Sequence, residues 1–272
     1  MLVGMTTLGL GHEPLDRALS FAIAAGCQTV ELNGRQTVHQ AVWRQAGVEG
    51  VRAQIAASGL AIGSLGGYCS MAQLADEALS SEVEQLVGYC AIARELGIPV
   101  VRAFAGDIVD GYTLDALYPR LVTGFKAVMA RISGWPVRVG IENHGLLIND
   151  GDALASLVRD VGAPGLGITL DTGNFCWAGY SIDQAQRFFE RLVPLTINVH
   201  AKDGRFVDGE WVLVPAGRGD LDLAGLIQRL AQSGYDGQVV SEYEGTGEFG
   251  QCTIESVAYL RGVVAGVQGE GH

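Results

Sequence analysis

The chain has 272 residues, of which 48% are hydrophobic, a length that suits one large α/β domain at least as well as two small ones. Its formal net charge is −12 and no basic patch offsets it, which argues against binding to a nucleic-acid backbone or an anionic membrane. Five scattered cysteines, no signal-peptide pattern and no apolar run approaching the ~18 residues of a membrane span predict a soluble, cytoplasmic protein with free thiols.

Strand-like and helix-like patterns alternate along the whole chain. In order, the predicted elements are strand 2–8, helix 14–25, strand 29–33, helix 48–58, strand 61–65, helix 80–96, strand 99–104, helix 114–132, strand 137–141, helix 151–161, strand 166–170, helix 181–192, strand 195–199, helix 221–233, strand 238–241 and helix 251–265. Several of the strands are apolar on both faces, as parallel strands covered by helices should be. Glycines such as Gly97 and Gly234 follow the helices, where chain reversal favours them.

Eight strand–helix units predict a single (β/α)8 barrel that forms one domain over residues 1–272. No linker, low-complexity tract or block of like charges marks a boundary within it. A doubly wound open sheet is the alternative. It is disfavoured because no Gly-x-Gly-x-x-Gly motif follows the first strand.

Four of the predicted strands lead directly into a side chain that can bind a metal ion. These residues are Glu142, Asp171, His200 and Glu242. A charge at the end of a buried strand is unfavourable unless it is paired or coordinated, and the C-terminal ends of barrel strands form the active-site face. Three carboxylates and one imidazole make a hard, oxygen-rich donor set. We therefore expect one divalent ion per chain, with Mn²⁺, Mg²⁺ or Co²⁺ favoured over Zn²⁺.

The motifs around these residues resemble the xylose-isomerase-like TIM barrel superfamily, which includes sugar-phosphate isomerases and epimerases and the AP-endonuclease family 2 type. They are Ile-Glu-Asn-His at 141–144, Leu-Asp-Thr-Gly-Asn at 170–174, His-Ala-Lys-Asp at 200–203 and Ser-Glu-Tyr-Glu-Gly at 241–245. The resemblance implies a metal held by Glu142, Asp171, His200 and Glu242. It also implies that Glu142 and Glu242 face each other across the substrate as the catalytic pair.

Two departures from the family pattern narrow the choice of branch. Ketose 3-epimerases carry a His three residues after the Asp ligand, where this chain has Asn174, and a substrate-binding Glu where it has Ile148. A tagatose- or psicose-epimerase assignment is therefore weakened. The endonuclease branch needs further His and acidic ligands for three zinc ions. Five histidines and a strongly acidic balance make it improbable.

Several residues near the same strand ends are candidates for contact with a substrate: His144, Lys202, Asn174, Asn33 and Arg205. Glu31 joins Asn33 as a candidate at the end of the second strand, whereas His12 and His39 are expected on the surface. Arg205 and Arg218 lie in the loop where barrels often bind phosphate. Glu244 and Glu248 in the next loop would repel a phosphate, so an unphosphorylated polyol or keto-sugar is favoured.

The predicted function is that of a metal-dependent isomerase or epimerase of a small hydroxy-carbonyl compound. The metal would stabilise the enediolate that forms when a glutamate removes a carbon-bound proton. A dehydratase of the inosose or dehydroshikimate kind would use the same site, with His144 or Lys202 as the acid. A barrel that binds a sugar without converting it is a third reading. The small molecule is the expected partner in all three, and a homo-oligomer is possible.

Overall fold

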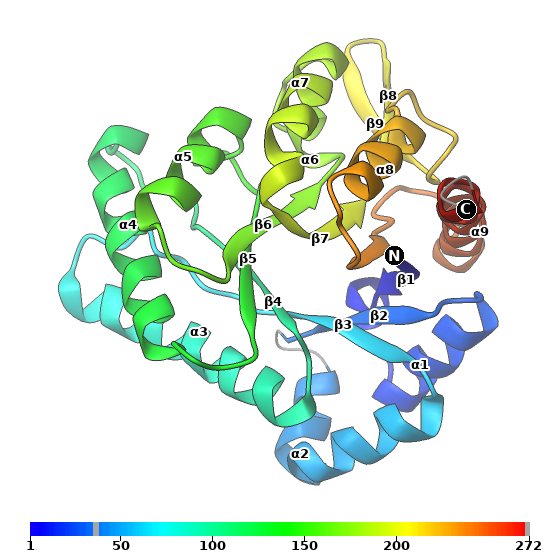
Figure 1. The fold of residues 1–272 in the computed structure, drawn as a ribbon, viewed down its shortest axis with the longest axis horizontal. Coiled ribbons are helices and arrows are strands. Elements are labelled where there is room, and N and C mark those ends of the chain that lie inside the picture. Colours follow the sequence, from blue (N-terminus) through cyan, green and yellow to red (C-terminus); the bar gives the residue numbers. More distant parts are fainter. Residues whose placement is uncertain (35–37, 270–272) are drawn as a thin grey trace.

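The computed structural model describes residues 1–34 and 38–269 of the chain. Eight parallel strands close into a barrel in the order β1-β10-β7-β6-β5-β4-β3-β2 (Figure 1). The barrel strands are β1 (Leu2–Thr6), β2 (Thr29–Asn33), β3 (Ala61–Gly66), β4 (Val100–Phe104), β5 (Arg138–Glu142), β6 (Leu166–Asp171), β7 (Thr196–Ala201) and β10 (Gln238–Ser241). This arrangement is the predicted (β/α)8 barrel.

Helices surround the barrel and cover the outer faces of its strands (Figure 1). They are α1 (Leu15–Ala24), α2 (Val38–Ser58), α3 (Asp76–Leu96), α4 (Leu114–Arg131), α5 (Gly151–Val161), α6 (Asn174–Trp177), α7 (Ile182–Leu192), α8 (Leu223–Gln232) and α9 (Phe249–Gly269). The last helix, α9, packs against both β1 and β10, where the first and last strands of the chain meet. Within the described ranges, no helix is long and apolar enough to cross a membrane.

Side chains alternate along each strand, and this alternation divides an apolar outer layer from a polar barrel interior. On β5, for example, Val139 and Ile141 are fully buried hydrophobic residues, whereas Glu142 belongs to the other face. The interior side chains below the mouth include an unusual number of buried polar groups: Thr29, Ser64, Thr169, Asn198 and Gln238. This polar interior requires hydrogen-bond partners for every member, and those partners lie both on neighbouring strands and on strands across the barrel.

The predicted elements exist, but three details differ from the sequence interpretation. The first strand ends at Thr6, and a 3-10 turn, η1 (Leu8–Leu10), follows it. The second helix begins at Val38, ten residues before the predicted start. Gly47, with φ 64°, is not helical and interrupts this helix. It separates the amino-terminal part of the helix from residues 48–58, the part that the sequence pattern predicted.

The sequence interpretation also missed a hairpin after β7. Strands β8 (Asp203–Val207) and β9 (Glu210–Val214) pair antiparallel and project from the barrel (Figure 1). The connection is Asp208-Gly209, and both residues have positive φ, 52° and 89°. Asp-Gly between strand-forming residues is a strong hairpin signal, because only such residues tolerate two successive positive φ angles. The short helix α6 was missed as well, since four residues carry no helical periodicity.

Candidate metal centre

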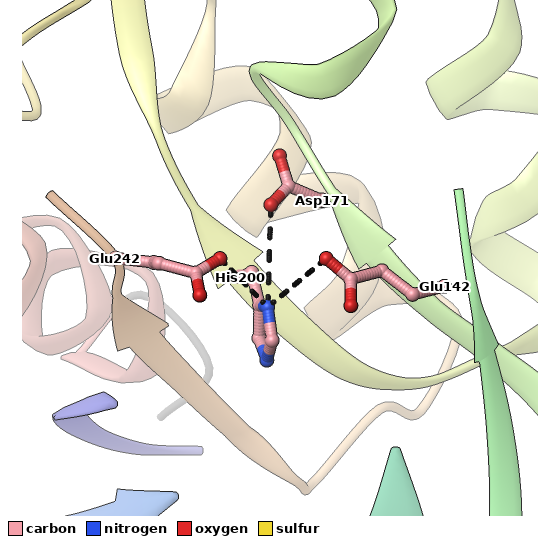
Figure 2. A group of neighbouring side chains, drawn as sticks. All are labelled: Glu142, Asp171, His200 and Glu242. Atoms are coloured by element: carbon pink, nitrogen blue, oxygen red, sulfur yellow. Dashed lines mark hydrogen bonds and ion pairs between the residues drawn. The ribbon is translucent and has the colours of Figure 1, made fainter. Parts of the chain in front are cut away.

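Four side chains converge at the C-terminal end of the barrel, as predicted. Glu142 ends β5, Asp171 ends β6, His200 lies in β7 and Glu242 follows β10. All four are buried, and one ligand atom from each lies within 4.8 Å of the others. Figure 2 shows His200 between the two glutamates, with Asp171 approaching from a third direction. The barrel therefore brings together the complete set of predicted ligands.

The imidazole of His200 presents different nitrogens to different neighbours. Its Nδ1 lies 3.0 Å from Glu242 Oε2, 3.5 Å from Glu142 Oε1 and 4.0 Å from Asp171 Oδ2 (Figure 2). Its Nε2 lies 2.9 Å from Glu31 Oε2, on the opposite edge of the ring. Nδ1 is therefore the nitrogen that faces the cluster of carboxylates, and Nε2 faces away from it.

Lys202 is a second cationic group inside the cluster. Its Nζ lies 3.1 Å from both Asp171 Oδ2 and Glu242 Oε2, and 2.6 Å from Glu244 Oε2. Nζ also donates to Asn174 Oδ1 at 3.3 Å. Lys202 is buried, whereas Glu244 is about half exposed at the rim, so the ammonium group connects the interior of the site to its entrance. The sequence made Lys202 a candidate for contact with a substrate, and the structure pairs it with Asp171, Glu242 and Glu244.

Arg102 is a buried site residue that the sequence analysis missed. Its Nε lies 3.2 Å from Glu142 Oε2 and 3.5 Å from Glu31 Oε1. The guanidinium carbon lies 4.3 Å from the ring centre of Phe104 and 4.6 Å from that of Tyr68. The signal in the sequence was an arginine in the middle of the apolar strand β4. A charge there needs a buried counter-charge.

The carboxyl groups have pKa values that differ strongly within a few ångströms. Burial raises the pKa of Asp171 to about 8, although the positive charge of Lys202 acts in the opposite direction. Burial would also raise the pKa of Glu31, but His200 and Arg102 outweigh it and hold the pKa at about 2. Such divergence among neighbouring acids is typical of functional sites.

The two basic groups respond to the same excess of negative charge. Burial acts to lower the pKa of His200, but the carboxylates of Glu31 and Glu242 raise it well above its usual value. Burial likewise acts to lower the pKa of Lys202, and Asp171 and Glu242 raise it well above its usual value. The cluster therefore favours bound positive charge, either as protons or as a cation.

The donor set fits a single divalent cation. Three carboxylates and one imidazole nitrogen form a hard site of the type that binds Mn²⁺ or Mg²⁺, and three negative charges are reduced to one by a divalent ion. The buried Oδ2 of Asp171 points into the cluster, where Lys202 Nζ lies 3.1 Å and His200 Nδ1 4.0 Å from it, so it occupies a position where positive charge is favourable. Asp171 Oδ1, in contrast, accepts from the backbone N–H groups of Gly173 and Asn174, which fixes the carboxylate.

A pocket of about 450 Å³ opens above this cluster. It is lined by Leu8, Asn33, Tyr68, Arg102, Phe104, Glu142, His144, Lys202, Glu242 and Glu244. Three of the predicted substrate contacts, Asn33, His144 and Lys202, thus line the pocket. His144 is exposed and stacks on Phe104, with ring centres 4.1 Å apart and planes at 24°.

The other two predicted substrate contacts lie elsewhere. Asn174 is buried behind the cluster, where its Nδ2 donates to Asn143 O at 3.0 Å and to Glu142 Oε1 at 3.4 Å. Arg205 lies on the exposed hairpin strand β8 and donates to the carbonyl of Arg218, outside the pocket lining. The hairpin, absent from the predicted elements, carries this side chain away from the pocket.

Two further histidines were expected on the surface. His12 is exposed and lies 3.5 Å from Glu13, in agreement with that expectation. The side chain of His39 lies outside the described part of the chain.

A closed parallel barrel with this quartet at its C-terminal end defines a TIM barrel with a candidate metal centre. The family described as xylose isomerase-like TIM barrel matches residues 19–263, and the chain belongs to this family. This confirms the superfamily inferred from the four motifs.

One curated relative is an uncharacterized protein of Methanocaldococcus jannaschii, 30% identical over 113 residues. The match covers 39% of this chain and only 36% of the relative's length.

Solved structures of several proteins are similar over nearly the whole chain. A D-tagatose 3-epimerase-like protein has a TM-score of 0.81 at 19% identity, covering 100% of both chains. The IOLI protein, solved with a zinc atom, has a TM-score of 0.78 at 14% identity, covering 98% of both. A probable 3-DHS dehydratase, AsbF of Bacillus anthracis, has a TM-score of 0.75 at 19% identity, covering 96% of this chain and 99% of the other. These likenesses establish the fold.

Proposed function

We propose that the protein is a divalent-metal-dependent isomerase or epimerase of a small, neutral hydroxy-carbonyl compound such as a keto-sugar. The observation that carries the proposal is the convergence of Glu142, Asp171, His200 and Glu242 at the floor of a pocket of about 450 Å³. Names of fold neighbours, which include a tagatose-epimerase-like protein, support the enzyme class without identifying the substrate.

Glu142, Asp171, Glu242 and the Nδ1 of His200 would hold the ion, which when bound polarises substrate oxygens as a Lewis acid. The two glutamates approach from opposite sides of His200 (Figure 2). Each would use one oxygen as a ligand and keep the other for the substrate; for Glu142 this second oxygen, Oε2, also lies 3.2 Å from Arg102 Nε, which would position it. One glutamate would remove a proton from the carbon next to the carbonyl, and the same or the other glutamate would return it.

The charges of the site favour a neutral substrate. Four buried carboxylates belong to Glu31, Glu142, Asp171 and Glu242, and two buried cations, Arg102 and Lys202, lie among them. One divalent ion and a neutral His200 would bring the buried charge to zero. An anionic substrate would then be desolvated without a counter-charge, which is unfavourable.

The pocket wall supports the same substrate class. Tyr68, Phe104 and His144 contribute aromatic surface, while Asn33 and Lys202 contribute polar groups. A sugar or cyclic polyol has apolar C–H faces and polar edges, and it can satisfy both kinds of wall. Apolar linings with a few polar groups are typical of sites that bind small molecules.

A dehydratase acting at the same site is the second candidate. The observation in its favour is that Lys202 and His144 line the pocket beside the glutamates, where either could donate a proton to a departing hydroxyl group. The fold is also shared with the probable 3-DHS dehydratase. For the metal, we favour Mn²⁺, Mg²⁺ or Co²⁺ because oxygen ligands dominate the set, although the IOLI structure was solved with zinc.

The experiment that tests the function is a panel of neutral ketoses and inososes, incubated with the Mn²⁺-loaded protein in D₂O. Deuterium uptake at a substrate carbon, followed by NMR, is the expected result for an isomerase or epimerase. Uptake accompanied by net loss of water identifies the dehydratase. Binding of panel members without exchange in any of them contradicts both enzymes and leaves a sugar-binding barrel.

A further inference from the structure

Glu31 lies directly beneath the metal centre and does not reach the pocket. It is completely buried on β2, and it is not among the residues that line the pocket. Its Oε2 lies 2.9 Å from His200 Nε2, and it accepts from Ser64 Oγ at 2.5 Å and from Asn198 Nδ2 at 3.0 Å. The contact with substrate suggested by the sequence is therefore replaced by a contact with the imidazole ligand.

We propose that Glu31 is a positioning residue that makes Nδ1 of His200 the metal-binding nitrogen. This inference rests on the proposed function, because it takes a divalent ion as the group that Nδ1 binds. A carboxylate accepts hydrogen bonds and donates none, so a ring nitrogen that faces one carries a proton, and without an ion this holds for both nitrogens of His200. A cation held by Glu142, Asp171 and Glu242 would displace the proton of Nδ1, whereas Glu31, which lies outside the quartet, would keep the proton on Nε2.

A neutral side chain could not replace Glu31 without a mismatch. Three donors surround Oε2, and the Nε of Arg102 lies 3.5 Å from Oε1. Both oxygens therefore face donors, and only a carboxylate presents acceptors on both sides. A glutamine that turns its NH₂ group toward Arg102 opposes that donor, and one that turns it toward His200 opposes the three donors around Oε2.

The surrounding network holds Glu31 at a fixed position. Asn198 Oδ1 accepts from Gln238 Nε2 at 3.0 Å, and the same Nε2 donates to Ser64 Oγ at 2.6 Å. Gln238 Oε1 in turn accepts from Thr29 Oγ1 at 2.7 Å. Ser64, Asn198 and Gln238 come from β3, β7 and β10, so three strands of the barrel hold the carboxylate that orients His200, whereas Thr29 contacts only the outer Oε1 of Gln238.

Arg102 extends this support to a second ligand. Its Nε lies between Glu31 Oε1 at 3.5 Å and Glu142 Oε2 at 3.2 Å. The guanidinium therefore links the carboxylate behind the imidazole ligand to a carboxylate of the quartet. Groups of this kind, behind the ligands of a metal, generally change metal affinity or activity by roughly 10–100-fold when they are removed.

The test compares Glu31→Gln, Glu31→Asp and the control Thr29→Val with the wild type. Titration calorimetry with Mn²⁺ should show affinity on the order of 10–100-fold weaker for Glu31→Gln. Glu31→Asp keeps two acceptor oxygens on a shorter side chain, so it should fall between Glu31→Gln and the wild type. Thr29→Val removes the far end of the same buried network at nearly constant shape, and it should bind Mn²⁺ like the wild type.

Nitrogen NMR of the Mg²⁺-loaded protein provides a readout that a merely structural role would not move. His200 should carry its proton on Nε2 in the wild type, and this preference should weaken in Glu31→Gln. Wild-type Mn²⁺ affinity in both Glu31 variants would overturn the inference, as would an equal loss of affinity in Thr29→Val. If Glu31→Gln does not fold, Glu31→Asp and Thr29→Val decide the question alone. A wild-type protein that binds no divalent ion would instead reject the proposed function.

Discussion

Asp171 and His200 occupy adjacent positions on neighbouring strands, since the β6–β7 register pairs their Cα atoms. The backbone thus delivers a carboxylate and an imidazole to the same level of the barrel. Each is then fixed by its own hydrogen bonds, Asp171 by two backbone amides and His200 by Glu31. At the scale of the residue, the site consists of groups whose orientation is set before any ligand arrives.

We predict that Asp171→Ala and His200→Ala abolish stoichiometric metal binding. Removal of one ligand leaves an incomplete donor set. A divalent ion would then gain too little binding free energy to give up the water molecules of its hydration shell. Elemental analysis of the purified proteins after loading with Mn²⁺ should show about one ion per chain in the wild type and a small fraction of that in the variants. Full occupancy in both variants would contradict the quartet as the metal site.

The two glutamates should be separable from the other ligands by their effect on turnover. A Gln at 142 or 242 keeps one coordinating oxygen but loses the basic one. Glu142→Gln and Glu242→Gln should therefore retain much of their Mn²⁺ and substrate binding and lose on the order of 10²–10⁴ in kcat. The comparison needs a matched variant, Glu95→Gln on the exposed face of α3, which should have wild-type kinetics. Solvent exchange of the substrate proton at wild-type rates in both glutamate variants would refute the mechanism.

At the scale of the element, the alternation of strands and helices could be predicted from the sequence, because each strand is an apolar run and each helix has apolar residues at helical spacing. The four candidate ligands could be predicted for the same reason: an acid or histidine that follows a buried strand stands out. Arg102 lies within a strand rather than after one, and sequence does not show which counter-charge faces it. Glu31 was recognised but was assigned to contact with the substrate. Its depth in the barrel depends on packing across strands, which the sequence does not show.

The N-cap of α5 offers a test of element stability away from the chemistry. Asp150 accepts from the backbone N–H groups of Asp152 and Ala153 and from the hydroxyl of Tyr180. Asp150→Ala should lower the free energy of unfolding by roughly 0.5–2 kcal/mol, the usual worth of an N-cap. Urea denaturation measures this change. Asp152→Ala serves as the control, because its side chain is exposed and pairs with Arg191 at the surface, so its removal should change stability little.

At the scale of the whole molecule, the net charge of −12 sets which partners are electrostatically favourable. The sequence resemblance included an endonuclease branch, yet duplex DNA would be repelled by this acidic chain. We predict no binding to duplex DNA in a gel-shift assay at low ionic strength. A shift that weakens steeply as salt is added would indicate phosphate contacts and would count against a small-molecule substrate.

The pairing of β1 with β10 has a consequence for how the protein acquires its site. The two strands lie at opposite ends of the chain, so the ring closes only when Leu2 meets Gln238. Contacts of such long sequence separation form late, after a large loss of chain entropy. Glu242 follows β10 directly, and β10 also pairs with β7, so the quartet is complete only once this last strand is in place. A bound ion would link the end of β10 to β5, β6 and β7 but would add no link to β1, so closure of the ring rests on the β1–β10 pairing and on α9, which packs against both strands.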